Sequence, residues 1–320
     1  MSTKHTHSHK AGVTQMTIRR LALALVITLI FVVIEALAGF AANSLALLTD
    51  AAHNLTDVAA LGLAWYAAWL ATKPSSAVQT YGYHRAGILI ALLNSTTLVV
   101  ISLGIFYEAA LRISAPPQVN SLLLIIVAAV AFVVNLGTAL IVRRGSENDL
   151  NMRGVFVHLA ADAVSTLGAV AAGIVIRFTG WTILDPLVSV LIGGLIVASA
   201  WQIIAQTVEI LMENTPRGLP MEKLVSDVQQ VEGVRGLHDV HAWSINESMR
   251  AFSAHLLTDD VTISDGARIQ SDVNRLLHER YGIAHATLQL ECVGCDPDAL
   301  YCEIEPHEHT SANLAEITAT

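Results

Sequence analysis

Six long apolar runs dominate the first two thirds of the 320-residue chain. A run of about 20 apolar residues is long enough to cross the hydrocarbon core of a bilayer as a helix. Glycine, proline and charged residues lie between the runs and provide turn chemistry there. The pattern predicts six membrane-spanning helices, at residues 18–40, 45–71, 86–111, 120–142, 152–177 and 183–206.

Composition divides the chain into a membrane part and an acidic part. Charged residues make up 14% of the sequence, whereas soluble domains carry about 25%. Residues 211–320 hold 7 Lys and Arg against 18 Asp and Glu. This excess of negative charge favours cations over nucleic acid as partners. We expect a disordered His-rich tail at 1–16, a six-helix transmembrane domain at 17–210, a water-soluble domain at 211–295 and a flexible tail at 296–320.

The basic residues of the loops predict the orientation. Lys and Arg precede the first run and flank the second and fourth loops, whereas the first loop has none. The positive-inside rule therefore predicts a multi-pass protein of the cell (inner) membrane with both termini in the cytoplasm. The three cysteines, at positions 292, 295 and 302, are poor material for a disulfide framework, which agrees with a reducing compartment.

Two of the apolar runs carry a histidine and an aspartate four residues apart. His53 and Asp57 form the first pair, and His158 and Asp162 form the second. On a helix, each pair shares one face, and charge at bilayer depth usually has a function. Two imidazoles and two carboxylates suit a tetrahedral Zn²⁺ site, although Co²⁺, Fe²⁺, Ni²⁺ and Cd²⁺ also fit. The simpler alternative is that these groups pair only with one another.

Protons and metal compete for these same ligands, so a site that opens to each side in turn exchanges Zn²⁺ for protons. A metal-binding membrane sensor or scaffold is an alternative hypothesis. A membrane-embedded zinc hydrolase is another, but it needs an open coordination position and a general base. We expect no enzyme and no organic cofactor. The roles of Glu35, Asp50 and His84 stay open.

The periodicity of the sequence changes after Pro216. Alternating apolar residues indicate strands, and apolar residues spaced by three or four indicate helices. Ser264 is a candidate cap for the second helix. The predicted order is αββαβ, a small metallochaperone-like α+β domain with helices on one face of a sheet. Its elements are a helix at 219–231, strands at 237–245 and 250–257, a helix at 263–281 and a strand at 285–291.

Several segments together resemble the cation diffusion facilitator family, in particular its zinc-transporting branch. The resemblance covers nearly the whole chain and implies a homodimeric bacterial-type zinc/proton antiporter with a cytosolic domain. It also implies that His53, Asp57, His158 and Asp162 form the transport site. The segments are Asn43–Asp57, Tyr81–Arg85, His158–Asp162, Asp185–Pro186 and His238–Ile245.

The same resemblance implies a second zinc site, at the dimer interface of the cytosolic domain. Its candidate ligands lie on the three predicted strands and just after them: His238, His255, His285, Glu291, Cys292 and Cys295. Strict alternation along the first strand places His241 on the face opposite His238. The alternative is that these are surface histidines and inert thiols.

Overall fold

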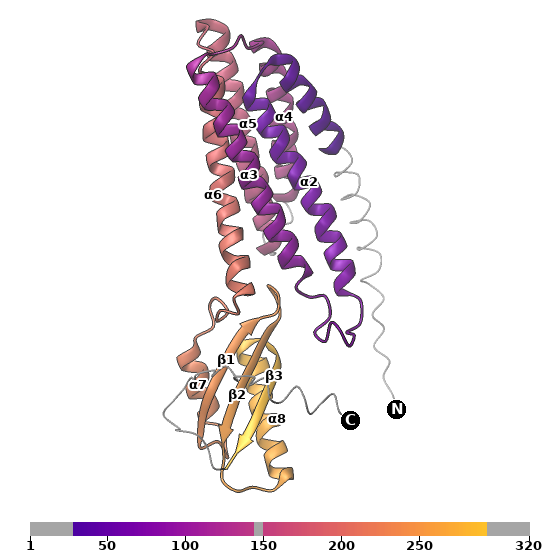
Figure 1. Cartoon of the computed structure of the whole chain (residues 1–320), viewed down its shortest axis with the longest axis vertical. Helices are drawn as coiled ribbons and strands as arrows, with labels where there is room; N and C mark the ends of the chain where they lie inside the picture. Colours follow the sequence, from indigo (N-terminus) through magenta and orange to yellow (C-terminus); the bar gives the residue numbers. More distant parts are fainter. Residues whose placement is uncertain (1–27, 144–149, 293–320) are drawn as a thin grey trace, which may run out of the picture. The chain divides into compact units, whose positions relative to one another are not determined.

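The computed structural model describes residues 28–143 and 150–292 (Figure 1). The packing of the chain divides it into two compact units between Val208 and Glu209. This division lies close to the boundary that the change in composition predicts. The predicted tails, 1–16 and 296–320, lie outside the described residues.

In the described residues of the first unit, all regular secondary structure is helical. Among the described residues, four helices contain a stretch long and apolar enough to cross a membrane, namely α3, α4, α5 and α6. The helix Thr28–Ala42 is apolar but shorter, and the start of the first predicted span lies outside the described residues. The helix α2 has the length of a span but carries polar side chains along it. The labelled helices are α2 (Leu45–Ala71), α3 (Ala86–Ser114), α4 (Ser121–Arg143), α5 (Leu150–Thr179) and α6 (Leu184–Leu211).

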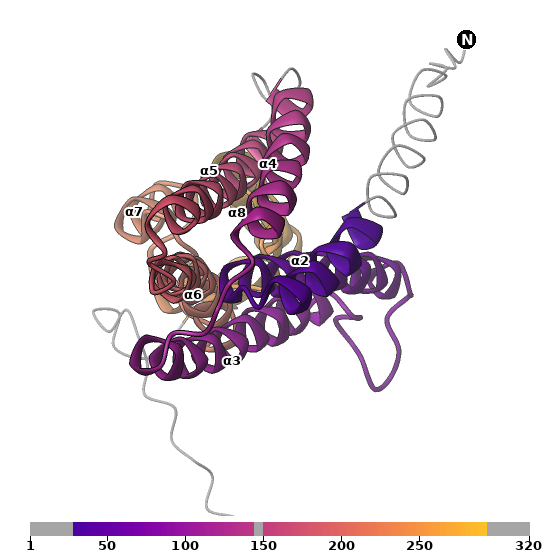
Figure 2. The ribbon, with the colours of Figure 1, turned by 90° about the horizontal axis from the view of Figure 1, so that it is seen from above.

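Close packing pairs these helices within the first unit. The helix α4 lies beside α5, and α2 lies beside α3 (Figure 2). A glycine allows α5 to lie close to α4, because a Cβ atom at Gly173 would lie 2.8 Å from Cγ1 of Ile125. Small side chains let membrane helices approach closely, and this packing replaces the hydrophobic driving force that water provides elsewhere.

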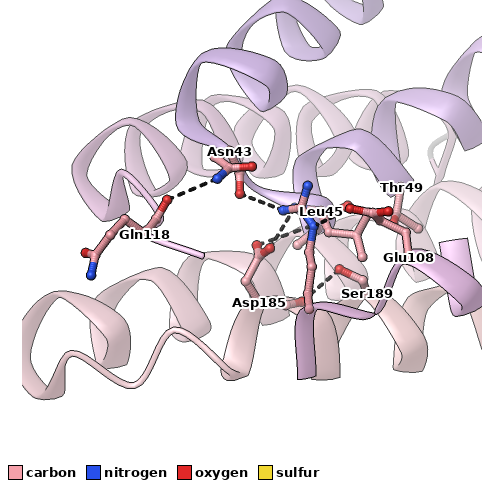
Figure 3. Close-up of polar contacts among 9 residues, drawn as sticks. Asn43, Leu45, Thr49, Glu108, Gln118, Asp185 and Ser189 are labelled. Atoms are coloured by element: carbon pink, nitrogen blue, oxygen red, sulfur yellow. Dashed lines mark hydrogen bonds and ion pairs between the residues drawn. The ribbon is translucent and has the colours of Figure 1, made fainter. Parts of the chain in front are cut away.

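A buried carboxylate from α6 holds the start of α2. Asp185 is fully buried and accepts hydrogen bonds from the Ser44 hydroxyl (2.5 Å) and the Leu45 amide (2.6 Å) (Figure 3). The first amides of a helix have no partner within the helix, and a carboxylate there satisfies them and complements the helix dipole. Arg112 of α3 joins the same junction by donating to the carbonyl of Asn43 at 2.8 Å. The helix that carries His53 and Asp57 is thereby tied to its neighbours at one end.

The second unit is an α+β domain with a three-stranded sheet. The strand order is β1-β2-β3, with β1 and β2 antiparallel and β2 and β3 parallel. Thr262, rather than the predicted Ser264, caps α8, because its hydroxyl accepts from the Asp265 amide. Gly282 ends α8 in the left-handed region, at φ 63°. The elements are α7 (Met221–Gln229), β1 (Gly236–Ser244), β2 (Arg250–Leu257), α8 (Ile263–Tyr281) and β3 (Ile283–Glu291).

Both helices of this unit cover the same face of the sheet. Alternate residues of each strand enter a single core together with the apolar faces of α7 and α8. The strand residues that alternate with these core residues, including His255 on β2, point to the opposite face of the sheet, which α7 and α8 do not cover. The buried core includes Leu224, Val228, Leu237, Val240, Phe252, Leu256, Val273 and Leu277.

Candidate metal centres

Side chains from two helices meet within the first unit. Nε2 of His53 on α2 lies 3.6 Å from Oδ2 of Asp57, one helical turn further along. The same nitrogen lies 3.4 Å from Oδ1 of Asp162 on α5. The three potential ligand atoms all lie within 4.8 Å of one another. A single ion between the helices is within reach of all three groups.

His158, the fourth predicted ligand of this centre, falls within α5. Its side chain lies outside the described part of the structure. The centre therefore contains three described candidate ligands, His53, Asp57 and Asp162, and the fourth stays a prediction.

The chemistry of this intramembrane centre favours a divalent cation. Two carboxylates and a neutral imidazole carry two negative charges, and the side chains of His53 and Asp162 are only 13% and 11% exposed. Buried charges are costly unless they are paired or coordinate a metal. Nitrogen and carboxylate oxygen ligands in a small shell suit Zn²⁺, whereas Mg²⁺ and Ca²⁺ require more oxygens.

A second centre lies on the free face of the sheet in the second unit. His238 of β1 and His255 of β2 are paired across the two strands, and their rings meet edge to face with centroids 5.2 Å apart. Oε1 of Glu291, at the end of β3, lies 3.1 Å from Nδ1 of His255. Its other oxygen lies 3.2 Å from Nε2 of His238. Three adjacent strands therefore each provide one candidate ligand.

The state of His238 fits a resident metal ion at this cytosolic centre. His238 is 1% exposed, and among the described residues neither of its ring nitrogens has a hydrogen-bond partner of acceptable geometry. Nε2 approaches Glu291 without forming such a bond, although a buried polar atom normally finds a partner. A metal ion bound to the His238, His255 and Glu291 group would satisfy this nitrogen.

A β-bulge changes which side chains of β1 face this centre. The register between β1 and β2 shifts between His238 and His241, and Asp239 adopts φ 51°. The extra residue reverses the alternation, so the expectation that His241 lies on the opposite face from His238 is wrong. Asp239 lies 3.1 Å from Nε2 of His241 and 3.5 Å from Nε2 of His255. Sequence reasoning did not identify Asp239, because strict alternation gave no reason to place it beside His255.

The other predicted cytosolic ligands lie apart from this group. His285 is exposed and precedes Glu291 by six residues on β3, a distance of about 20 Å along an extended strand. It therefore does not join His238 and His255 within one chain. Cys292 is exposed directly after β3, and Cys295 lies outside the described residues.

Comparisons with known proteins match both units. The profile of the cation efflux transmembrane domain matches residues 21–212, and that of the cation efflux protein cytoplasmic domain matches residues 216–293. The latter profile carries a dimerisation name, which is consistent with a dimeric assembly. The two matches together cover most of the chain.

Similar proteins cover nearly the full length of the chain. A cadmium, cobalt and zinc/H(+)-K(+) antiporter of Bacillus subtilis is 36% identical over 313 residues, which are 97% of this chain and 96% of the relative. The zinc transporter ZitB of Escherichia coli is 32% identical over 95% of this chain and 98% of the relative. The metal cation efflux system protein CzcD of Cupriavidus metallidurans is 31% identical over 92% of each. The chain thus belongs to the cation diffusion facilitator family, in its zinc-transporting branch, whose members are metal cation transporters and not enzymes.

Proposed function

We propose that this protein exports Zn²⁺ from the cytoplasm in exchange for protons. The observation that carries the proposal is the position of His53, whose Nε2 lies 3.6 Å from Asp57 and 3.4 Å from Asp162, on two different helices. In this proposal His158 completes a tetrahedral site of two imidazoles and two carboxylates. The names of the relatives, which include zinc, cadmium, cobalt and H(+)-K(+) exchange, support the same substrate class.

The proposed mechanism follows from the chemistry of the ligands. Zn²⁺ requires neutral imidazole and ionised carboxylate, so binding of the metal displaces protons from the site. When the site opens to the opposite side, protons compete with the metal and favour its release. A proton gradient directed into the cell therefore drives the metal outward.

The proposed topology has six spans and cytoplasmic termini. The helices α3, α4, α5 and α6 supply four spans, and the helix that ends at Ala42 and α2 supply the other two. The basic loops favour an inward orientation of both ends in the cell (inner) membrane. The acidic second unit then faces the cytoplasm, where its negative charge attracts cations.

We propose that the cytosolic centre holds a resident zinc ion. His238, His255 and Glu291 would hold the ion, and Asp239 lies close enough to His255 to orient its ring. A bound zinc ion would stabilise the sheet and a homodimer built on this face. Its ligands are separate from the transport site, because they belong to the other unit.

The test is zinc uptake into proteoliposomes under an imposed pH gradient. The wild type is compared with Asp57→Ala and Asp162→Ala, and with Glu108→Gln as a control. Glu108 also lies on a membrane helix, but it pairs with Arg112 and is 45% exposed. We expect gradient-dependent uptake in the wild type and the control, and none in the other two variants when they remain folded.

Two results would contradict this function. Uptake that survives both aspartate substitutions would remove the transport site from the proposal. Saturable zinc binding by the wild type without any uptake would instead favour a metal-binding sensor.

A further inference from the structure

A second polar cluster is buried beside the intramembrane metal centre. Glu35, on the helix Thr28–Ala42, is fully buried, and Asp50 and Asn54 of α2 are 4% and 8% exposed. Nδ2 of Asn54 lies 3.3 Å from Oε2 of Glu35 and 3.2 Å from Oδ2 of Asp50. Since both oxygens contact the same nitrogen, the two carboxyl groups lie side by side.

The surroundings of Glu35 do not support two ionised carboxylates. Among the described residues, its second oxygen, Oε1, is buried and has no hydrogen-bond partner. The space between Glu35 and Asp50 is otherwise lined by Thr166 of α5 and by apolar residues such as Ala128 of α4 and Ile192 of α6. Neighbouring like charges in such surroundings repel each other strongly, and one proton removes the repulsion.

The size of this space indicates whether a proton or a larger cation neutralises the pair of carboxyl groups. The space between Glu35 and Asp50 is too small to hold a water molecule, and a monovalent metal ion would need a comparable volume with several oxygen ligands. The amide nitrogen of Asn54 already lies against both carboxyl groups. A proton fits without moving any of these side chains.

The cluster is linked electrostatically to the metal centre. Asn54 directly follows His53 on α2, and Asp50 precedes His53 by about one helical turn. Asp50 interacts electrostatically with both His53 and Asp162. Asp50 is thus the titratable group that faces Glu35, and the side chains of His53 on α2 and Asp162 on α5 lie beyond it.

We propose that Glu35 is a proton-binding site, separate from the metal ligands, and that it carries one of the protons exchanged for zinc. In the metal-free protein the Glu35 carboxyl is neutral and hydrogen bonds within the cluster. When Zn²⁺ brings two positive charges to the adjacent centre, Glu35 releases its proton to water and becomes a carboxylate. The buried region then gains one net positive charge instead of two. This inference rests on the proposed exchange of zinc for protons.

The decisive variant is Glu35→Gln, which keeps the shape of the neutral acid but holds no exchangeable proton. Glu108→Gln is the matched control, since it makes the same change on another membrane helix. The first measurement is infrared spectroscopy of the full-length reconstituted protein, in which a protonated carboxyl has a carbonyl band that a carboxylate lacks. We expect a band in the wild type and the control that disappears on saturation with zinc and is absent from Glu35→Gln.

The second measurement counts protons moved per zinc ion with a pH-sensitive dye inside the vesicles. In Glu35→Gln the count should fall by about one proton per ion. Because a proton that leaves on zinc binding is linked to the affinity for zinc, the variant should also bind zinc at the His53 centre at least about tenfold more weakly at a pH where the wild type releases this proton completely. If Glu35→Gln does not fold, Glu35→Asp replaces it, and we expect it to keep a carboxyl band at a shifted frequency.

The outcomes separate this inference from the function on which it rests. If the wild type shows no gradient-driven uptake, the proposed exchange fails, whatever the infrared result. If the wild type transports but Glu35→Gln keeps the band and the proton count, only the role of Glu35 is overturned. A band that is missing in the wild type, together with uptake that requires K⁺, would assign the cluster to a monovalent cation and would also overturn the proposal.

Discussion

The two proposed metal centres use the same kinds of side chain but are built on different frameworks. In the first unit, His53 and Asp162 lie on separate helices, which are held together by side-chain packing. In the second unit, His238 and His255 lie on neighbouring strands that are joined by backbone hydrogen bonds. Helices can shift past one another without losing their internal hydrogen bonds, whereas strands cannot separate without breaking the ladder. The first framework suits a site that must release its ion, and the second suits a site that retains one.

The largest expected effect distinguishes the centre that transports zinc from the centre that retains it. Asp162→Asn should lower the initial rate of zinc uptake by at least about 100-fold, because an uncharged ligand cannot complete a site for a divalent cation. Glu291→Gln should change this rate by less than about threefold. Both rates are measured in the same proteoliposome assay. Equal losses in the two variants would mean that the centres work as one.

A second prediction concerns metal retention by the sheet. In the Asp162→Asn background, where the membrane centre is disabled, His255→Ala should weaken the remaining zinc binding by more than about 100-fold, because it removes a ligand and not an outer-shell partner. Isothermal titration calorimetry of the full-length protein measures this affinity. His278→Ala, which changes an exposed histidine of α8, is the control and should leave the affinity unchanged. A similar loss in the control would point to nonspecific binding by surface histidines.

A smaller effect is expected at the bulge. Asp239 contacts both His241 and His255 but lies 3.5 Å from the latter, so we expect it to orient His255 and not to bind the ion. Asp239→Gly keeps the positive φ angle without strain and should weaken cytosolic zinc binding by about tenfold, the lower end of what the loss of an outer-shell partner costs. The same calorimetric titration checks this value. A loss as large as that of His255→Ala would make Asp239 a direct ligand.

The smallest effect concerns the support of the sheet by its helices. Hydrogen bonds from the Tyr281 hydroxyl and from Arg280 hold the pKa of Asp227 on α7 below its usual range. Burial, together with Asp227, raises the pKa of Tyr281 to about 12. Since the pKa of Asp227 is depressed by folding, its stabilising contribution is present above the unfolded pKa and is lost as pH falls through the folded value.

Tyr281→Phe should therefore move the acid unfolding of the second unit to higher pH, by less than about one pH unit. Circular dichroism of the strand signal during an acid titration measures this shift. An unchanged midpoint would show that Arg280 alone holds Asp227.

The sequence predicted the parts of this structure that depend on periodicity. The bounds of α8 and β2 agree with the expected ranges 263–281 and 250–257, because their apolar spacing is regular and their ends carry turn residues. The spacing of His53 and Asp57 likewise predicted a shared helix face, and the 3.6 Å between Nε2 of His53 and Oδ2 of Asp57 agrees with that expectation.

Other features could not be predicted from periodicity, because they depend on tertiary contacts. The bulge at Asp239 inserts one residue into β1, and local propensity gave no sign of it. The hydrogen bond from Asn54 to Glu35 joins two helices. The sequence of neither helix shows how close the two helices lie in the folded protein. The resemblance implied that His285 belongs to the site at a dimer interface, and within one chain it lies six residues before Glu291 on β3, so that assignment stays a prediction.

The contact of Asp185 with the first turn of α2 has a mechanical consequence. Separating α2 from α6 at this end would break hydrogen bonds to the Ser44 hydroxyl and the Leu45 amide inside an apolar environment, where each unsatisfied group costs several kcal/mol, on the order of 2–7. This end of α2 therefore acts as a fulcrum. His53 and Asp57 lie two to three turns away from it, so a small tilt of the helix about the fulcrum changes the distance from these ligands to α5 while the anchored turn stays in place.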